Sequence, residues 1–413
     1  MDSSYRYEQD TLYCENVALA DVAAREGTPC YVYSKRAILN RFRAYDEAFG
    51  ETPHAICYAV KANGNLSLLR MLAEAGAGFD IVSGGELFRV LKAGGDAARV
   101  VFSGVGKTAD EISYALDMGI HGFNCESEAE LTLIDALAAR RGVTARAAVR
   151  VNPDVDAATH PYISTGLREH KFGIDITEVE GVYERARALK HLALEGVSCH
   201  IGSQILDPEP LIEAADRLAA LAGRLRSKGF DIGHLDIGGG VGVAYRPGET
   251  SPSIAEFVAA LLARVSGTGL RVLLEPGRSL VAEAGVLLAR VLYRKRNGAK
   301  EFVIVDASMT ELIRPALYSA YHEIVPLRRA HRGTIRADVV GPVCETGDFL
   351  ARGREIDNVL PGDLLAVRTA GAYGFVQSSN YNARPRPVEV LVDGDAYRVI
   401  RARENYEDLV RGE

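Results

Sequence analysis

Residues 54–83, HAICYAVKANGNLSLLRMLAEAGAGFDIVS, give the clearest indication of this chain's architecture. The segment runs from an apolar β-rich run, through a Leu- and Ala-rich stretch of helical period, to a second β-rich run. Such a strand–helix–strand unit is typical of a parallel sheet. Lys61 directly follows the first apolar run. It is either a solvated lysine at a strand end or a functional amine, and the other strand ends distinguish these interpretations.

The strand–helix unit recurs from about residue 35 to residue 280. Its β-rich runs are 54–60, 78–83, 99–104, 120–124, 145–152, 194–202, 232–240 and 270–277. Eight units over about 245 residues predict a (β/α)8 barrel of the TIM type, and a doubly wound open sheet is the alternative.

The pattern changes after about residue 285. The runs at 301–309, 334–350, 363–374 and 386–394 are β-rich and are separated by Pro/Gly turns, which predicts an antiparallel β domain. The opening segment, with TPCYVYS at 28–34, also has β character. We therefore expect a barrel over residues 35–280 and a β domain formed by 1–34 plus 281–413.

Composition limits the classes of partner. The 413 residues include 48 Lys and Arg against 55 Asp and Glu, a net charge of −7, with no long basic block. Nucleic acid is therefore not the expected partner. The N-terminus lacks the pattern of a secretory signal, and no apolar run reaches membrane-spanning length. Six scattered cysteines without a C-x-x-C pair predict a reduced, cytoplasmic setting, and the histidine spacing predicts no metal site.

Polar residues follow several of the predicted barrel strands. A barrel places its active site at the carboxyl ends of its strands, so these residues are expected to converge. They are Lys61 after the first strand, His200 and Ser203 after the sixth, Gly238, Gly239 and Gly240 after the seventh, and Glu275, Pro276, Gly277 and Arg278 after the eighth.

The last two strand ends together predict a phosphate site. Three consecutive glycines let backbone N–H groups converge on an anion, although GGG alone is more often a tight turn. EPGR (275–278) begins a predicted helix, whose N-terminus favours an anion. Barrels often bind phosphate at the loops after strands seven and eight.

A lysine opposite a phosphate site suits an imine with a phosphorylated aldehyde, of which pyridoxal phosphate is the obvious candidate. Such a cofactor needs an acid near its pyridine nitrogen so that the ring can accept electrons, and Glu275 is the candidate. His200 could lie flat against the ring, or it could be a satisfied core histidine.

The predicted β domain carries further candidate residues in three motifs. Arg314 and Tyr318 are four residues apart on one helical face, which suits either a carboxylate fork or a surface salt bridge. Cys344 lies beside Glu345 between glycine turns, where a buried inert thiol is the usual alternative. Tyr373 lies in the glycine-rich loop AGAYGF (370–375).

Taken in order, these motifs resemble the diaminopimelate decarboxylase family, pyridoxal-phosphate enzymes of the alanine-racemase/ornithine-decarboxylase fold group. The similarity covers about residues 5–395, and Thr346 is a slight departure because the family often has Ser there. The matching motifs are YAVKAN (58–63), DIVSGGEL (80–87), STGLREHKFGI (164–174), HIGSQ (200–204), GGG (238–240), EPGR (275–278), LIRPALY (312–318), GPVCETGD (341–348) and AGAYGF (370–375).

The resemblance implies specific roles. Lys61 would carry the cofactor as an imine, His200 would stack on its ring, and Glu275 would face the pyridine nitrogen. The residues implied for the phosphate are Ser203, Gly238, Gly239, Gly240 and the segment Glu275, Pro276, Gly277 and Arg278. The residues implied for the substrate are Arg278, Arg314, Tyr318, Glu345 and Tyr373, with Tyr373 also contacting the cofactor. Cys344 matches the proposed proton donor.

The implied reaction converts meso-2,6-diaminopimelate to L-lysine and CO2 at the D-centre, in a homodimer whose partner chain supplies Cys344 and its neighbours. Two alternatives remain: an ornithine- or lysine-type decarboxylase on the same fold, and a non-catalytic homologue. Ornithine and lysine lack a distal carboxylate, so Arg314 argues against the first. A racemase needs a second base, which GPVCETGD does not obviously supply.

Overall fold

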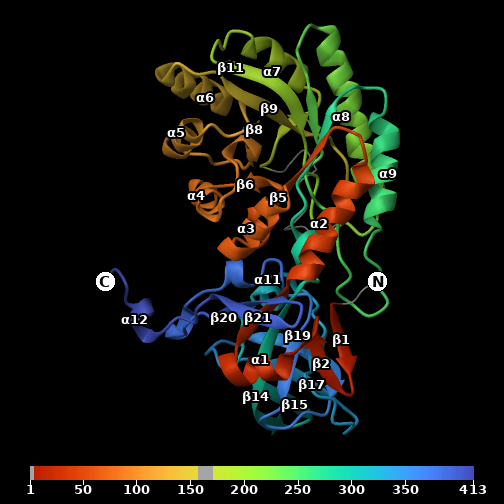
Figure 1. Cartoon of the computed structure of the whole chain (residues 1–413), viewed down its shortest axis with the longest axis vertical. Coiled ribbons are helices and arrows are strands. Elements are labelled where there is room, and N and C mark those ends of the chain that lie inside the picture. Colours follow the sequence, from red (N-terminus) through yellow and green to blue (C-terminus); the bar gives the residue numbers. More distant parts are fainter. Residues whose placement is uncertain (1–3, 157–170) are drawn as a thin grey trace. The chain divides into compact units, whose positions relative to one another are not determined.

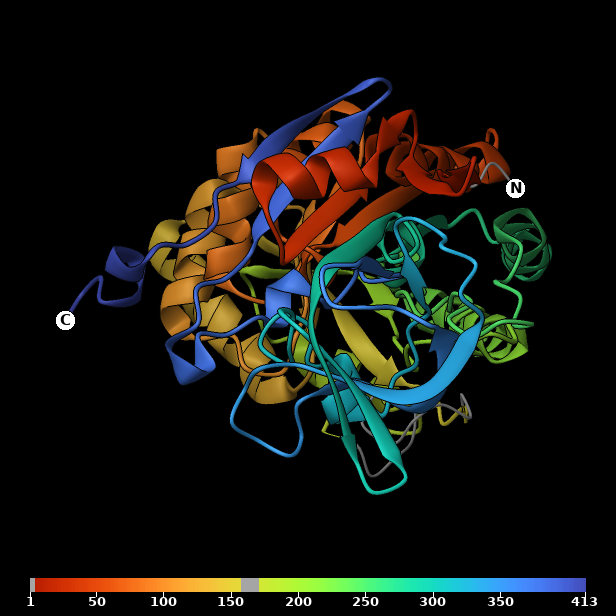
Figure 2. The same ribbon diagram turned by 90° about the horizontal axis from the view of Figure 1, so that it is seen from below.

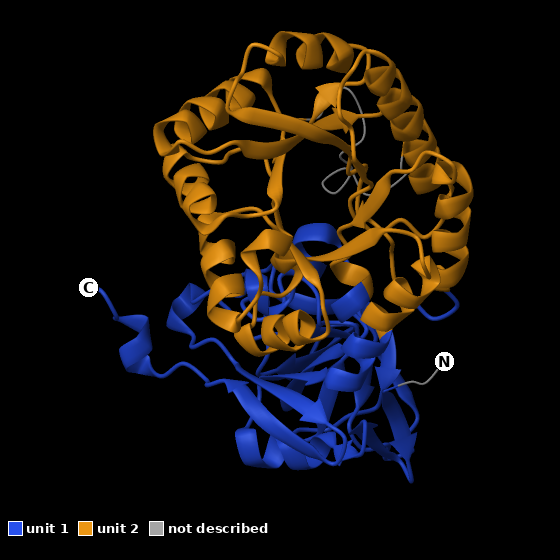
Figure 3. Ribbon diagram, turned by 45° about the horizontal axis from the view of Figure 1, so that its top comes forward, with its two compact units in different colours: residues 1–40, 244–249, 280–413 blue, residues 41–243, 250–279 orange. Residues whose placement is uncertain are grey.

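The computed structural model describes residues 4–156 and 171–413. The chain divides into two compact units, coloured separately in Figure 3. We call residues 41–243 and 250–279 the barrel unit, and residues 1–40, 244–249 and 280–413 the sheet unit. Within the motif STGLREHKFGI, residues 164–170 lie outside the described part of the chain.

The barrel unit contains a closed ring of parallel strands, several of which are labelled in Figure 1. In ring order they are β5 (His54–Ala59), β6 (Gly78–Ile81), β7 (Val100–Phe102), β8 (Gly122–Cys125), β9 (Ala145–Asn152), β11 (Leu192–Ser198), β12 (His234–Asp236) and β13 (Arg271–Leu274). The ring closes because β13 pairs with β5 and β8 pairs with β9. The predicted barrel is confirmed, and the open-sheet alternative is wrong. Each strand overlaps a predicted run, although β11 begins two residues before its run and β8 ends one residue after its run.

Helices surround this ring (Figure 3). They are α2 (Lys35–Phe49), α3 (Leu66–Glu74), α4 (Gly84–Ala93), α5 (Ala109–Met118), α6 (Glu128–Arg141), α7 (Val179–Ala186), α8 (Glu209–Ser227) and α9 (Ile254–Val265). Local sequence sets several of their ends. Thr108 and Glu111 form a capping box at the start of α5, and Gly119 ends that helix in the left-handed conformation. Short pieces complete the unit: η1 (Val60–Ala62), η2 (Ala97–Arg99) and β10 (Ile174–Asp175), which pairs with β9.

The sheet unit is built around a second sheet. Its main path runs β18 (Phe349–Asp357), β17 (Thr334–Val340), β15 (Lys300–Val305), β14 (Gly285–Asn297), β4 (Cys30–Ser34), β20 (Val388–Asp393) and β21 (Ala396–Arg401). β19 (Leu364–Val367) pairs with β14 and with β16 (Ile324–Pro326). The teal hairpin in Figure 2 is formed by β14 and β15. The N-terminal strand β4 thus lies between strands from the other end of the chain.

This sheet differs from the antiparallel expectation at two pairs. β15 pairs with β17, and β4 with β20, in parallel. Parallel neighbours need a long connection. The first pair is joined through α11 (Arg314–Tyr318) and β16, and the second through the whole barrel sequence. Hairpin signals in the sequence therefore could not reveal either pairing.

The N-terminal segment covers part of this sheet. It forms a small sheet of β1 (Tyr5–Glu8), β2 (Thr11–Cys14) and β3 (Val17–Ala18), followed by α1 (Leu19–Glu26). Leu12, Leu19 and Val22 pack in one buried cluster with sheet residues such as Val286 and Val390. Burial of these side chains ties the start of the chain to the sheet.

The remaining short elements are α10 (Arg278–Val281), η3 (Phe375–Gln377), η4 (Tyr381–Ala383) and α12 (Tyr406–Leu409). In the described ranges, none of the helices has the length and apolar character needed to cross a membrane.

Candidate active site

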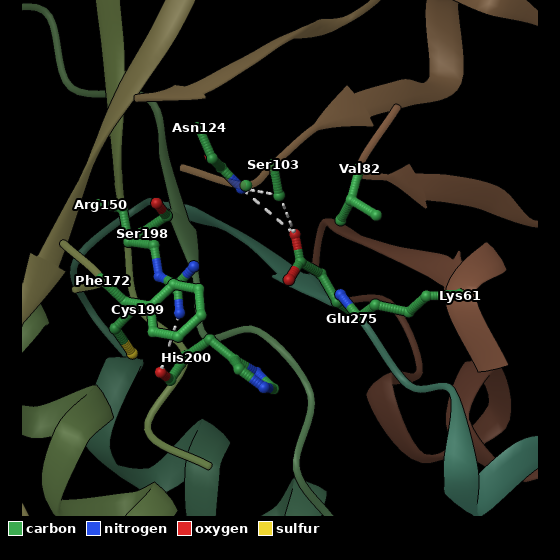
Figure 4. Close-up of a pocket in the computed structure, with 11 residues that line it drawn as sticks. Lys61, Val82, Ser103, Asn124, Arg150, Phe172, Ser198, Cys199, His200 and Glu275 are labelled. Atoms are coloured by element: carbon green, nitrogen blue, oxygen red, sulfur yellow. Dashed lines mark hydrogen bonds between the residues drawn. The ribbon is translucent and has the colours of Figure 1, made fainter. Parts of the chain in front are cut away.

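A cavity of about 190 Å³ lies in the barrel unit, near the carboxyl ends of the strands (Figure 4). Its lining residues come from most of the strands and the loops that follow them. They are Lys61, Val82, Ser103, Gly104, Asn124, Arg150, Phe172, Ser198, Cys199, His200 and Glu275. Three residues predicted from strand ends, Lys61, His200 and Glu275, therefore meet in one cavity.

Lys61 lies in the single turn η1 that follows β5. Its Nζ donates to Oδ2 of Asp80 at 2.7 Å, and Asp80 is fully buried while the lysine side chain is 33% exposed. The other oxygen of this carboxylate, Oδ1, is buried without a hydrogen-bond partner among the described residues. Lys61 is thus paired within the cavity wall, unlike a solvated strand-end lysine.

Glu275 follows β13 and belongs to a buried polar cluster. Its Oε1 accepts from the hydroxyl of Ser103 at 3.3 Å and from the amide of Asn124 at 3.2 Å. The same Asn124 amide donates to Oδ2 of Asp236 at 2.9 Å. Figure 4 shows Asn124 and Ser103 directed at the Glu275 carboxyl. Asn124 therefore ties the two carboxyl groups together.

These carboxyl groups hold protons more tightly than usual. Burial, and then the charges of Asp236 and Asp80, raise the pKa of Glu275 well above its ordinary value. Burial also raises the pKa of Asp236, against the effect of its hydrogen bond from Asn124. Because two buried carboxylates side by side repel, the pair holds a proton more tightly than an isolated carboxyl group would, and the larger rise in pKa is at Glu275.

His200 presents a neutral ring to the cavity. Gly239 N–H donates to its Nδ1 at 3.1 Å, so the ring proton resides on Nε2. Burial, together with the charges of Lys61 and Arg150, lowers the pKa of His200 well below its ordinary value. A neutral, flat imidazole is suited to stacking against another ring.

Arg150 supports this wall of the cavity. It forms a buried ion pair with Glu126 at 2.6 Å, and it donates to the carbonyl oxygen of His200 at 3.3 Å. Its guanidinium lies 4.8 Å from the centre of the Phe172 ring. Glu126 also accepts from the N–H of Gly173 at 2.7 Å, which fixes the backbone beside Phe172.

The glycines after β12 allow very close backbone packing. A Cβ on Gly239 would lie 2.3 Å from the Glu275 carbonyl oxygen, and one on Gly240 would lie 2.7 Å from that of Gly202. Gly238 and Gly240 also have positive φ angles of 71° and 120°. Both packing and backbone conformation therefore require glycine at this bend.

The neighbouring loop after β13 lies beside this bend. The N–H of Glu275 donates to the carbonyl oxygen of Gly238 at 2.8 Å, and the carbonyl of Pro276 accepts from Ala59 at 3.2 Å. Arg278 donates to the hydroxyl of Ser203 through Nε at 3.3 Å and Nη2 at 3.1 Å. The helix that begins at Arg278 is short, α10, but the predicted adjacency of the GGG and EPGR segments is present.

The other candidates belong to the sheet unit. Arg314 and Tyr318 are the two ends of α11, and Arg314 is 6% exposed. Cys344 is exposed, and its backbone N–H donates to Oδ1 of Asn382 at 2.8 Å. Glu345 is also exposed, and Tyr373 has a positive φ of 55°. All six cysteines lie in the described ranges as free thiols, and Cys344 alone among them is exposed.

Several residues that line the cavity or bond to its lining were not predicted. Asp80 and Asp236 each lie inside an apolar run, GFDIVS and HLDIGGG, and a buried charge in such a run is itself a sign of a functional partner. Ser103 and Asn124 carry no comparable signal, because uncharged polar residues are common at strand ends. In the described part of the chain, no cluster of three or more His, Cys, Asp or Glu side chains could hold a metal ion.

The donor set fits the cofactor expected from the sequence. The cofactor's aldehyde would meet the amine of Lys61, and its aromatic ring would lie against the neutral imidazole of His200. Its basic ring nitrogen would face the protonated carboxyl of Glu275. The buried Ser198 hydroxyl and Asp80 Oδ1, which lack hydrogen-bond partners among the described residues, leave polar atoms for a bound group.

Comparison with known proteins agrees with this chemistry. The family described as "Pyridoxal-dependent decarboxylase, pyridoxal binding domain" matches residues 35–282. Diaminopimelate decarboxylase of Pseudomonas aeruginosa is 54% identical over 410 residues, covering 99% of this chain and 98% of the relative.

Solved structures agree with the sequence relatives. The structure of diaminopimelate decarboxylase from Helicobacter pylori complexed with L-lysine has a TM-score of 0.92 at 44% identity, covering 95% of this chain and 98% of that chain. The structure of diaminopimelate decarboxylase from M. jannaschii in complex with L-lysine has a TM-score of 0.93 at 36% identity, covering 98% of this chain and 96% of that chain. This chain belongs to the pyridoxal-phosphate-dependent decarboxylases and, within them, to the diaminopimelate decarboxylase family.

Proposed function

We propose that this chain decarboxylates meso-2,6-diaminopimelate at its D-centre, releasing CO2 and L-lysine as a step of lysine biosynthesis. The observation that carries the proposal is the cavity that joins the amine of Lys61, the neutral ring of His200 and the protonated carboxyl of Glu275. The full-length identity of 54% to a diaminopimelate decarboxylase supports the choice of substrate.

The residues of the barrel unit would hold the cofactor. Lys61 would bind its aldehyde end, His200 would cover one ring face, and Glu275 would hold a proton at the ring nitrogen. The phosphate would be held by Ser203, Gly238, Gly239, Gly240, Pro276, Gly277 and Arg278. When bound, pyridoxal phosphate supplies an electron-poor ring that accepts the electron pair left by the departing carboxylate.

Two buried carboxyl groups would then perform different tasks. Glu275 retains its proton because of burial and the neighbouring Asp236, so its O–H can be shared with a basic nitrogen. Asp80 is held 2.7 Å from Lys61 Nζ, where its negative charge favours the ammonium form of that lysine. Lys61 would be able to give up and recover a proton at Nζ during each turnover.

The sheet unit would supply substrate recognition and a proton. Arg314 would bind the distal carboxylate of the substrate, and Glu345 would bind its distal ammonium. Arg278 is proposed as a further substrate contact. Tyr318 and Tyr373 would complete the site. Cys344, the exposed cysteine, would protonate the substrate carbon after CO2 has left.

We further propose that the chain acts as a homodimer in which the partner supplies Cys344 and Glu345. Both residues are exposed within this single chain, so they remain accessible to another copy. A cytoplasmic setting is proposed because all six cysteines, each within the described ranges, are free thiols. The proposed partner is a small amino acid, with neither nucleic acid nor membrane involved.

The test is CO2 release from a panel of amino acids by the holoenzyme. We expect release from meso-diaminopimelate and none from the L,L-isomer, which has no D-centre. Ornithine, lysine and arginine should react about 10⁴-fold more slowly, because each lacks the distal carboxylate and would leave the site's arginines unpaired. Comparable rates with ornithine or lysine would instead indicate a basic amino-acid decarboxylase, and no release from any substrate would indicate a non-catalytic homologue.

A further inference from the structure

His322 is a fully buried histidine of the sheet unit, located between α11 and β16. Both of its ring nitrogens have hydrogen-bond partners. Nε2 lies 3.0 Å from Nη1 of Arg314, and Nδ1 lies 2.9 Å from the carbonyl oxygen of Arg368. The ring therefore connects the proposed carboxylate-binding arginine to the backbone that follows β19.

These contacts determine the protonation state of the ring. A guanidinium can only donate, so Nε2 of His322 must accept from Arg314. A carbonyl oxygen can only accept, so Nδ1 must carry the proton that is donated to Arg368. His322 is therefore a neutral imidazole in the Nδ1–H tautomer. Its Nε2 accepts a hydrogen bond from Arg314, and its Nδ1–H donates one to the carbonyl oxygen of Arg368.

The carbonyl oxygen that anchors the ring is itself fixed. Arg368 directly follows β19, and its N–H donates to the carbonyl oxygen of Glu323 at 2.8 Å. Its side chain pairs with the Glu323 carboxylate at 2.9 Å. Since β19 pairs with β16 and β14, the position of His322 is set by the sheet.

Arg314 is held from a second side by Tyr245. The guanidinium lies 4.7 Å from the centre of the Tyr245 ring, and that ring packs edge-on against His322 at 5.3 Å between centres. The imidazole thus contacts both the arginine and the ring on which the arginine lies. Both of these partners are neutral, so they orient the guanidinium without neutralising its charge.

We propose that His322 is a positioning residue that sets the plane of the Arg314 guanidinium, and thereby determines the selectivity for ligands with a distal carboxylate. The inference rests on the proposed function, in which Arg314 binds that carboxylate. A two-pronged Arg–carboxylate contact requires both groups to be nearly coplanar, so a freely rotating guanidinium would bind a carboxylate less well. The affinity for ligands that lack the carboxylate should not depend on His322.

Two amide variants separate this role from simple packing. In His322→Gln the longer side chain can place Oε1 near Nε2 of the replaced ring, where it would accept from Arg314. In His322→Asn the amide can reach the Arg368 carbonyl but falls short of Arg314. The variants have the same functional group and differ mainly in reach, so a selective defect in the Asn variant reports on the Arg314 contact.

The probes are L-lysine and 1,5-diaminopentane, which differ by one carboxylate. Their binding to the holoenzyme is followed by the absorbance of the cofactor, alongside KM and kcat for meso-diaminopimelate. We expect the wild-type protein to prefer L-lysine by at least about tenfold, a difference of about 1.4 kcal/mol. H322Q should keep that preference, while H322N should lose it through weaker L-lysine binding and a raised KM, with diaminopentane affinity unchanged.

The outcomes distinguish the inference from the proposed function. If H322N prefers L-lysine over diaminopentane as strongly as the wild type does, the positioning role is overturned. It is also overturned if H322N binds both ligands more weakly by the same factor. A wild-type protein that does not prefer L-lysine would instead contradict the proposed carboxylate site. If H322N does not fold, ¹⁵N NMR of the wild-type holoenzyme decides, because an Nε2–H tautomer at His322 would rule out the hydrogen bond from Arg314.

Discussion

Lys61 and Asp80 form an ion pair between two neighbouring barrel strands, with Nζ 2.7 Å from Oδ2. Asp80 lies in β6 opposite Ala59 of β5, and Lys61 follows β5 by two residues. The pairing is therefore fixed by strand register. An opposite charge at this distance favours the ammonium form of the lysine, which is not the form that attacks an aldehyde.

Asp80→Asn should therefore change how the protein takes up its cofactor. Without the negative charge the amine of Lys61 is neutral at a lower pH, so the cofactor-free variant should react with pyridoxal phosphate several-fold faster at pH 6. Stopped-flow absorbance between pH 6 and 9 measures this rate. The ratio of the two rates should stay roughly constant while both amines are mostly protonated, and it should shrink only at a pH where the wild-type amine is itself largely neutral. An equally slow reaction of both proteins at pH 6 would show that Asp80 does not control the amine.

Glu275→Gln should remove a pH-dependent loss of folding stability from the cofactor-free protein. The raised pKa keeps Glu275 protonated in the folded state, whereas an unfolded glutamate ionises above its ordinary value of 4.5. The folded state then binds more protons, so wild-type stability falls as pH rises above about 4.5, by at most about 1.4 kcal/mol per pH unit from this group.

The Gln variant lacks that slope because it cannot ionise. The difference in free energy of unfolding, variant minus wild type, should grow from pH 5 to pH 7 in urea titrations followed by circular dichroism. A pH-independent difference would mean that Glu275 ionises normally in the folded protein. Turnover of the Gln holoenzyme should also fall by about 10²-fold or more, because the amide cannot supply a proton.

Gly239→Ala tests the bend between β12 and the following loop. The added methyl would lie 2.3 Å from the Glu275 carbonyl oxygen, so the bend must move and the variant should lose about 1–3 kcal/mol of stability together with cofactor affinity. Gly223→Ala is the matched control, because Gly223 lies in the interior of α8 with no atom near its Cβ position.

The control should gain about 0.5–1 kcal/mol from higher helix propensity and bind the cofactor as the wild type does. Fluorescence titration with pyridoxal phosphate and thermal melting compare the three proteins. Wild-type cofactor affinity in the Gly239 variant would show that the bend does not contribute to the phosphate site.

Cys344→Ala should separate cofactor binding from turnover. The side chain is exposed, so its removal creates no cavity in this chain, and the variant should keep its stability and the absorbance of the bound cofactor. Loss of a positioned proton donor should lower kcat by about 10²- to 10⁴-fold. Carbon dioxide release under saturating substrate measures the effect, and unchanged turnover would remove the thiol from the mechanism.

The sequence predicted the barrel well because its signals are local. Each strand is a short apolar run, and capping residues such as Ser83 and Gly94 around α4 mark helix ends within a few residues. The strand ends then converge because the fold has only one carboxyl edge, so the order of the strands along the chain is enough to group Lys61, His200 and Glu275. The parallel pairings β4–β20 and β15–β17 have no comparable signal in the local sequence.

The polar side chains that hydrogen-bond to the proposed site residues were harder to predict. The Asn124 amide contacts the carboxyl groups of Asp236 and Glu275, which are 112 and 151 residues away along the chain, and the hydroxyl of Ser103. His322 is likewise defined by Arg314 and by a backbone oxygen 46 residues away. A side chain whose role depends on distant partners has no spacing pattern of its own, so only the folded structure reveals it.

The most direct test of this account is to reduce the holoenzyme with borohydride, digest it and map the pyridoxyl group by mass spectrometry. The account predicts one modified residue, Lys61, with no labelling at Lys107, a buried lysine of the same barrel whose Nζ already bonds to Glu130 and two carbonyl oxygens. A pyridoxyl group on any other residue, or none in protein supplied with the cofactor, would contradict it.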